Sequence, residues 1–426
     1  MTDTLHVGYC ATPVTGCSTT CQEWSTSCIR RYAGRDPKAP GSIAADDGRI
    51  RRLPGSDANV LRDTPPVTRT TSDQSDESDR AGRTPSGGQG ASPAPAGTVT
   101  GQDPASSGTG RWGMTIPLAD APLTDLPALC GRLADAGYTD VWSSEATTTD
   151  GIVPLALAAG EPRLRLGSAI VSAYTRGPAL LAQTAATMAA AAPGRFVLGL
   201  GTSSDVIVSN WNSIPFSRPC QRMLDTVRFL RRAFAGEKIS EEFPSFTVRG
   251  FRLGVVPSAP PKIMVAALRP RMLEFAGREA DGVILNWLSP ADCDTVLPHV
   301  REHNSDAEVV ARIFVYVHDD PAAARPLLRK MIAAYLTVPV YREFHLWLGR
   351  QAALEGMWSA WAAGDRKAAL AAIPDEVVDE LIVHGTVEQC RAGLRRYVEH
   401  GVTTPVLSIV NGDPNPMDLA SALAAD

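Results

Sequence analysis

The chain has 426 residues, of which 44% are hydrophobic and 20% are charged, and its formal net charge is -5. This length is sufficient for one large domain or two medium ones with a sizeable core. The small acidic excess excludes a general nucleic-acid binder, because binding to phosphates requires clustered Lys and Arg. No uncharged apolar run is long enough to span a membrane, and residues 1–15 lack the pattern of a signal peptide. We therefore expect a cytoplasmic protein that binds neither nucleic acid nor membrane.

Residues 1–110 differ sharply in composition from the rest of the chain. They are rich in Ser, Thr, Gly, Pro, Asp and Arg, and residues 64–110 hold almost no large apolar side chain. Such a segment cannot bury enough surface to offset the entropy lost on ordering, so we expect it to be disordered. Two origins stay open: a genuine disordered extension, or a stretch translated from a start codon set too early, with the folded part beginning near Met114.

The cysteines at the start of this segment raise a third alternative, a zinc site. Cys10, Cys17, Cys21 and Cys28 are separated by six, three and six residues, which matches no common zinc pattern. In the rest of the chain, no His pairs with a carboxylate at metal-ligand spacing. We therefore predict that the protein has no catalytic metal.

From residue 112 onward, apolar runs alternate with helical segments. Runs typical of strands cover residues 112–117, 140–142, 164–171, 195–200, 262–267, 282–286, 309–317 and 404–410. Helical segments cover residues 123–136, 150–159, 178–192, 221–234, 270–280, 290–303, 321–372 and 386–400, and residues 243–253 alternate as in a hairpin. Near-continuous apolar strands are typical of a parallel sheet covered on both faces. The alternation predicts a (β/α)8 TIM barrel with insertions over residues 111–426. An open doubly wound sheet is the rival, but no Gly-x-Gly-x-x-Gly follows the first strand.

In a (β/α)8 barrel the active site lies at the carboxyl ends of the strands. Glu145 follows the second strand, where a carboxylate could act as an acid or base or could simply cap a helix. A turn of Gly201, Thr202 and Ser203 follows the fourth strand, and its backbone N–H groups could approach an anion. Arg269 precedes Pro270 at a helix start, which suits a phosphate unless the Arg is an ordinary surface residue.

Other residues point to a cofactor without identifying it. Trp142, Trp211 and Trp287 could line a flat aromatic molecule or pack in the core. The chain has no Gly-x-Ser-x-Gly elbow and no phosphate loop, so a bound cofactor is expected to carry the chemistry. An apolar stretch over residues 336–348 predicts a hydrophobic substrate or a subunit interface.

Several segments have a distinctive order along the predicted barrel. Residues 163–170 (Arg-Leu-Arg-Leu-Gly-Ser-Ala-Ile), 176–183 (Arg-Gly-Pro-Ala-Leu-Leu-Ala-Gln) and 194–204 (Gly-Arg-Phe-Val-Leu-Gly-Leu-Gly-Thr-Ser-Ser) together resemble the luciferase-like monooxygenase family. Residues 211–219, 266–273 and 280–288 further resemble the branch of that family that uses coenzyme F420. The resemblance extends from about residue 112 to the end of the chain.

This resemblance implies a barrel that binds coenzyme F420, or alternatively FMN, at its carboxyl face and transfers hydride to or from a small organic substrate. It implies a non-proline cis peptide bond near residues 171–173, behind the cofactor ring, and assembly as a homodimer. Glu145 is the candidate for proton transfer. Three functions remain open: an F420-dependent oxidoreductase, an FMN-dependent monooxygenase and a cofactor-binding barrel without turnover. The cofactor-binding residues that the family resemblance implies are Ser172, Ala173, Gly201, Thr202, Ser203, Ala267, Leu268, Arg269 and Asn286.

Overall fold

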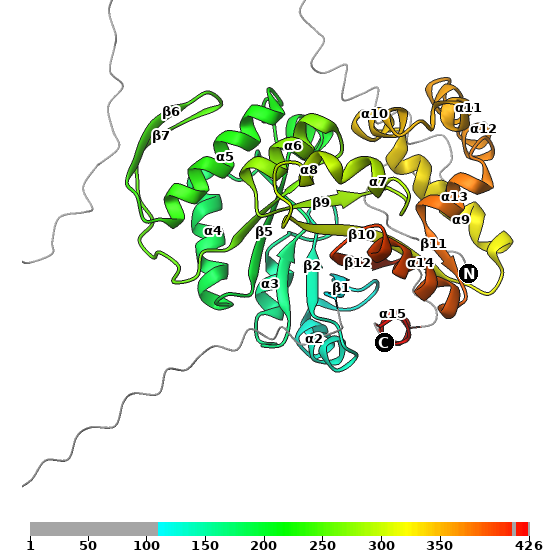
Figure 1. Ribbon diagram of the computed structural model, residues 1–426, viewed down its shortest axis with the longest axis horizontal. Coiled ribbons are helices and arrows are strands. Elements are labelled where there is room, and N and C mark those ends of the chain that lie inside the picture. Colours follow the sequence, from blue (N-terminus) through cyan, green and yellow to red (C-terminus); the bar gives the residue numbers. More distant parts are fainter. Residues whose placement is uncertain (1–109, 411–414, 425–426) are drawn as a thin grey trace, which may run out of the picture. The chain divides into compact units, whose positions relative to one another are not determined.

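The computed structural model describes residues 110–410 and 415–424. Within this part, eight parallel strands pair side by side into a closed barrel surrounded by helices, which confirms the predicted (β/α)8 fold (Figure 1). Around the barrel the strands run β1, β2, β3, β5, β8, β9, β10 and β12, and β12 pairs again with β1. Their bounds are β1 (Gly113–Ile116), β2 (Asp140–Ser143), β3 (Arg165–Ser168), β5 (Phe196–Gly201), β8 (Lys262–Ala266), β9 (Gly282–Asn286), β10 (Glu308–Val317) and β12 (Thr404–Ile409).

Except for Gly110, the predicted N-terminal extension and its four cysteines fall outside the described residues. In the part that the structure does describe, no helix is long and apolar enough to cross a membrane.

Helices alternate with the strands along the chain. α14 begins with a capping box, in which the Thr386 hydroxyl accepts from the Gln389 N–H and the Gln389 side chain accepts from the Thr386 N–H. The predicted single helix over residues 290–303 is instead two short helices, with Pro298 at the start of the second. The outer helices are η1 (Leu123–Asp125), α2 (Leu126–Asp135), α3 (Val153–Ala158), α4 (Pro178–Ala191), α5 (Pro219–Phe234), α6 (Pro270–Glu279), α7 (Cys293–Val296), α8 (Pro298–Arg301), α14 (Val387–Glu399) and α15 (Pro416–Ala422).

A helical insertion, residues 321–381, follows β10 and lies beside one part of the barrel (yellow to orange in Figure 1). Its buried side chains form a hydrophobic cluster of their own, which also includes Trp287 and Phe314 from the ends of barrel strands. These two aromatic residues therefore join the insertion to the barrel. The insertion comprises α9 (Pro321–Leu336), α10 (Pro339–Trp347), α11 (Gln351–Ala362), α12 (Arg366–Ala371) and α13 (Asp375–Leu381), and leads into the short strand β11 (Val383–Gly385).

The predicted hairpin is present outside the barrel as β6 (Ile239–Phe243) and β7 (Phe246–Phe251), slightly earlier in the chain than expected. Phe243, Phe246 and Phe251 surround Phe229 of α5, with ring centroids 6.2, 6.1 and 5.5 Å from it. This aromatic group attaches the hairpin to the barrel.

The third predicted strand is shorter than expected. β3 ends at Ser168, and the chain pairs with β5 again only at β4 (Val171–Ser172). Between them lies a non-proline cis peptide bond, Ala169–Ile170. The resemblance implied such a bond near residues 171–173, so its predicted position is corrected to the residues just before that stretch. The error follows from reading residues 164–171 as one uninterrupted strand.

Candidate functional site

The inner face of the barrel is defined by side chains from six strands that pack against one another. Side chains two positions apart on a strand share a face. Residues two positions before or after a member of this cluster on the same strand therefore also face inward. The cluster is formed by Trp142, Val197, Met264, Ile284, Val310 and Val406.

At the amino ends of the strands, the inner face carries a paired charge network. Arg165 forms ion pairs with Asp140 and Glu308, and its Nη1 donates to Glu308 Oε2 at 2.8 Å. The Thr404 hydroxyl donates to Glu308 Oε1 at 2.8 Å, and Lys262 Nζ lies 3.6 Å from Oε2. Burial raises the pKa of Glu308, but the hydrogen bonds and positive charge of Arg165 outweigh it and bring that pKa down to about 2. We call these five residues the base network.

The middle of the barrel is filled by the indole ring of Trp142, which is 1% exposed. Glycines on both neighbouring strands make room for it: a Cβ on Gly167 would lie 2.2 Å from Trp142 Cε3, and one on Gly113 would lie 3.1 Å from its Cδ1. Trp142 therefore fills the core rather than lining a cofactor. It separates the base network from the opposite end.

At the carboxyl ends of the strands, the inner face carries polar atoms that lack partners. Thr115 Oγ1, Asn286 Oδ1 and Arg312 Nε are buried and make no hydrogen bond. Asn286 pairs in register with Arg312 on the next strand, and its Nδ2 donates to Tyr341 Oη at 3.2 Å. Arg312 Nη2 donates to Ser408 Oγ at 3.1 Å. Buried polar atoms without partners are uncommon, and here they indicate where a ligand or ordered water binds. We call Thr115, Asn286, Arg312 and Ser408 the polar arc.

The strands on the other side of the same rim present apolar groups. Ala169, Ile170 and Ala266 pack against the inner cluster. Gly201 lacks the Cβ that would lie 2.7 Å from Ile170 Cδ1, so this glycine makes room for Ile170. The rim is therefore polar over β9, β10, β12 and β1, and apolar over β3, β5 and β8.

Glu145, the predicted acid or base, lies in a loop after β2 with its oxygens already engaged. Arg176 forms an ion pair with Oε2, the Thr175 hydroxyl donates to Oε1 at 3.3 Å, and the Gly151 N–H lies 3.4 Å from Oε2. Arg176 also pairs with Asp150. These contacts give Glu145 a role in holding two loops together.

Ser172 ends β4 and Ala173 follows it, and both residues are buried. The Ser172 hydroxyl accepts from the Tyr174 N–H at 3.1 Å, and the Ala173 carbonyl accepts from Arg222 Nε at 3.0 Å. Arg222 also stacks on the ring of Tyr174, 5.4 Å from its centroid. These side chains and carbonyls shape the turn, and contact with a cofactor stays a prediction for both residues.

The two predicted anion-binding segments start at neighbouring strand ends. Ser203 has a left-handed backbone (φ 61°), so its N–H and that of Thr202 can diverge from the strand direction toward an anion. After β8, the Ala267 N–H donates to the Ile284 carbonyl at 3.2 Å and is already used by the sheet. The backbone N–H groups of Leu268 and Arg269 lie at the start of α6, and the Arg269 side chain there is half-exposed.

The remaining predicted aromatic residues are not brought together. Trp287 is buried against Phe314 and Tyr335, with centroids 4.5 and 4.6 Å away, whereas Trp211 is exposed on the π-helix η2 (Val206–Trp211). In the apolar stretch over residues 336–348, Leu336 and Phe344 are fully buried and present no surface to a substrate or subunit.

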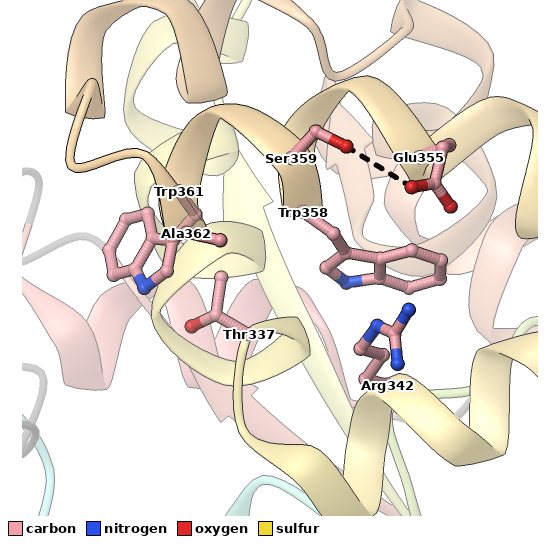
Figure 2. Close-up of a pocket in the computed structure, with 7 residues that line it drawn as sticks. All are labelled: Thr337, Arg342, Glu355, Trp358, Ser359, Trp361 and Ala362. Carbon is pink, nitrogen blue, oxygen red and sulfur yellow. Dashed lines mark hydrogen bonds between the residues drawn. The ribbon is translucent and has the colours of Figure 1, made fainter.

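Two hollows are lined by residues outside the polar arc. The smaller, about 300 Å³, is lined by the insertion, and Figure 2 shows Arg342 against the Trp358 ring and Glu355 bonded to Ser359. The larger, about 1030 Å³, runs beside α13, β11 and α14. Its Arg350 pairs with Asp292 at 2.9 Å, and its His384 pairs with Asp379 at 2.8 Å.

In the smaller hollow, the side chains of Thr337, Glu355, Trp358 and Ser359 have protein partners. In the larger one, Arg350, Asp292 and Asp379 are paired, whereas His384 Nδ1 is buried and makes no hydrogen bond. Among residues 110–410 and 415–424, no three His, Cys, Asp or Glu side chains meet as metal ligands would.

The luciferase-like monooxygenase family model matches residues 98–404, and the chain belongs to this family. It is accordingly an oxidoreductase enzyme built on a (β/α)8 barrel. Enzymes with this barrel carry their active sites at the carboxyl rim, where Thr115, Asn286 and Arg312 have unpaired polar atoms.

Individual relatives cover most of the described chain. A Mycobacterium tuberculosis protein named "Putative coenzyme F420-dependent oxidoreductase" is 26% identical over 332 residues, covering 70% of this chain and 93% of the relative. The 5,10-methylenetetrahydromethanopterin reductase of Archaeoglobus fulgidus is 26% identical over 294 residues, covering 66% and 86%. The solved coenzyme F420-dependent tetrahydromethanopterin reductase of Methanopyrus kandleri has the same fold, with a TM-score of 0.62, 19% identity and coverage of 74% and 98%.

Of the polar arc, the sequence analysis included Asn286 among its candidates but not Thr115, Arg312 and Ser408. A signal for Arg312 was present, because it is the lone charged residue inside an otherwise apolar run, residues 309–317. A charge in a buried parallel strand needs a partner, and such a residue merits inclusion in a candidate site. Thr115 and Ser408 carry no such signal, since hydroxyl groups occur throughout strands.

Proposed function

We propose that the protein is a coenzyme F420-dependent oxidoreductase that acts on a small organic substrate at the carboxyl rim of the barrel. The observation that carries the place of the site is the division of the rim into a polar arc and an apolar half. A deazaflavin ring is flat and largely apolar, with carbonyl and N–H groups along one edge, so it complements both halves. The names of the F420-dependent relatives support this cofactor over others.

When bound, the cofactor supplies a ring carbon that donates or accepts hydride. The residues of the chain then bind and orient. Asn286 Oδ1 is available to accept from an N–H, while Arg312 Nε and the Thr115 hydroxyl are available to donate to carbonyl oxygens. Ala169, Ile170 and the apolar half of the rim exclude water from the ring.

The phosphate of the cofactor is proposed to bind at the adjoining strand ends. Thr202 and Ser203 offer backbone N–H groups and hydroxyls, and Leu268 and Arg269 offer N–H groups at the start of α6, where the helix dipole favours an anion. Gly201 contributes by keeping the turn compact, because its missing Cβ leaves space for Ile170. Ala267 is assigned a place in the sheet rather than in the phosphate site.

Proton transfer to or from the substrate requires a group that can change its protonation state. Glu145 remains the candidate acid or base, but it can exchange a proton with a substrate only after its ion pair with Arg176 opens. If it acts only through its contacts with Thr175 and Arg176, it is a positioning residue. Replacing Glu145 by Gln then weakens cofactor binding without abolishing the pH dependence of turnover.

An FMN-dependent monooxygenase is the second candidate. A Baeyer-Villiger monooxygenase solved in complex with FMN shares the fold, with a TM-score of 0.53 at 14% identity. A flavin ring presents the same polar edge, so the polar arc fits either cofactor.

A binding titration of the full chain with F420 and separately with FMN, followed by fluorescence, tests the proposal. We expect tight binding of F420 and weak binding of FMN. An Asn286→Ala variant should weaken F420 binding, whereas Ser359→Ala in the smaller hollow should not. Binding of FMN alone would replace the proposal by the monooxygenase, and binding of neither would contradict both.

We propose that residues 111–426 form the functional unit and that it acts in the cytoplasm. We also propose that two copies associate, since Val153 and Leu157 of α3 and Leu180 of α4 are exposed apolar side chains. A sedimentation boundary at the monomer mass would contradict the association.

A further inference from the structure

We propose that Arg312 binds a delocalised oxyanion of the molecule held at the barrel rim. Two sources present this chemistry: the carboxylate of an organic substrate, or the carbonyl edge of the cofactor ring when that edge carries negative charge. The inference rests on the proposed function for the location of the ligand. It assigns to this enzyme a charge requirement that the cofactor class alone does not specify.

The positive charge of Arg312 is not balanced within the described residues. Its contacts there are a hydrogen bond from Nη2 to Ser408 Oγ at 3.1 Å and a stacking contact with Phe314, whose ring centroid lies 4.8 Å from Cζ. Nε is buried and has no acceptor. Ser408 is itself neutral and also lies on the inner face, so it orients the guanidinium without compensating its charge.

Two other arginines, the buried Arg165 and the partly buried Arg222, show that this arrangement is unusual. Arg165, on the inner face at the opposite end, is held between the carboxylates of Asp140 and Glu308. Arg222 lacks a carboxylate partner, but its Nε and Nη1 donate to the carbonyls of Ala173 and Ser245 at 3.0 and 3.3 Å. Arg312 combines an unbalanced charge with an unused donor.

The chemistry of the guanidinium identifies the class of partner. Removing a cation from water without a counter-charge is unfavourable, and an anion at the rim would relieve that cost. A guanidinium donates in a fixed planar fork, which fits two oxygens of one delocalised group better than a single point charge. Thr115 Oγ1, on the same polar arc, offers a further donor to such a group. A carboxylate meets these conditions, whereas a neutral ligand leaves the charge uncompensated.

The test uses the full chain and four proteins: the wild type, Arg312→Met, Arg312→Lys and the control Arg342→Met. Arg342 is a matched control because it also stacks on an aromatic ring, 5.0 Å from Trp358, but lies in the helical insertion (Figure 2). In the first arm, calorimetry measures binding of benzoate and of its neutral analogue benzamide, with and without F420. In the second arm, fluorescence measures the Kd for F420. Thermal unfolding of each variant is recorded alongside.

If the oxyanion belongs to the substrate, the wild type and Arg342→Met prefer benzoate to benzamide by about ten-fold or more, a margin expected for a charged hydrogen bond. Arg312→Met abolishes that preference and leaves the Kd for F420 unchanged. If the oxyanion belongs to the cofactor, Arg312→Met raises the Kd for F420 by a similar factor and no protein prefers benzoate. Either result supports the proposal and identifies the source.

The proposal is overturned if Arg312→Met binds benzoate, benzamide and F420 as the wild type does. Should Arg312→Met fail to fold, Arg312→Lys decides, because it keeps the charge but loses the planar fork and Nε. Wild-type affinities in a folded Arg312→Lys would then also overturn it. A wild type that prefers benzoate but does not bind F420 contradicts the proposed function and leaves the oxyanion site standing.

Discussion

Both ends of the barrel carry charged and polar side chains on the inner face, but these side chains differ in whether they find partners within the protein. At the amino end, Asp140 and Glu308 each pair with Arg165. At the carboxyl end, Asn286 Oδ1 and Arg312 Nε have no partner. Both patterns occur on one strand, since Glu308 and Arg312 both belong to β10. The comparison indicates that the amino end contributes to stability, whereas the carboxyl end leaves groups available to a ligand.

The largest effect is expected from breaking the base network. Arg165→Met removes the cation that pairs with both Asp140 and Glu308, which keep only the half-exposed Arg111 and Lys262 as partners. We expect the loss to cost about 3 kcal/mol of unfolding free energy. Urea denaturation measures it. The matched control is Arg163→Met, two residues away, whose half-exposed side chain pairs with Asp135 and Glu161 at the surface and should matter little. Equal losses in the two variants would show that the base network has no special role.

Acidification should weaken the same end of the barrel. The pKa of Glu308 is lowered from 4.5 to about 2 in the folded protein, so this carboxylate stabilises the fold fully above pH 4.5. Its contribution to the free energy of unfolding is about 3 kcal/mol at most and is lost as the pH falls from about 4.5 toward 2. The slope of unfolding free energy against pH in this window should be smaller in Glu308→Gln than in the wild type. An unchanged slope would assign acid sensitivity to other carboxyl groups.

The packing of the Trp142 ring between the two ends of the barrel can be tested through Gly167. A methyl group there would collide with the Trp142 ring, and we expect Gly167→Ala to destabilise the protein by about 1–3 kcal/mol. Adding Trp142→Leu should recover part of the loss, because the two side chains share the same space. Gly160→Ala is the control, since nothing lies within 4 Å of a Cβ at that position. If urea denaturation shows that the free-energy losses of Gly167→Ala and Trp142→Leu simply add in the double variant, the proposed packing is contradicted.

The smallest effect on stability is expected at the opposite end. Arg312→Met removes one protein hydrogen bond and no ion pair, so the unfolding free energy should change by about 1 kcal/mol or less. Chemical denaturation of Arg312→Met beside Arg165→Met makes the comparison directly. A loss as large as that of Arg165→Met would show that Arg312 is part of the structural framework and would remove the distinction between the ends.

The strand order and the barrel were predictable because each barrel strand is a nearly uninterrupted apolar run separated from the next by a helical segment. The sequence did not predict which inward-facing residues pack or pair inside the barrel and which remain available to a ligand. Whether Trp142 faces the core or a ligand depends on Gly167 and Gly113, which oppose it only once the strands are in register. The break at Ala169–Ile170 and the unpaired state of Arg312 likewise depend on contacts between strands far apart in sequence. Glu145 was identified from its place after a strand, whereas its ion pair with Arg176 became visible only in three dimensions.

A crystal structure of the full chain with F420 would show whether the carboxyl rim is the ligand site. We expect the cofactor ring at this rim, with Asn286 Oδ1, Arg312 Nε and Thr115 Oγ1 bonded to the cofactor or to a ligand beside it. We also expect Asp140 and Glu308 to keep their ion pairs with Arg165. A cofactor bound elsewhere, or a rim in which these three atoms are satisfied by the protein alone, would contradict this placement of the site.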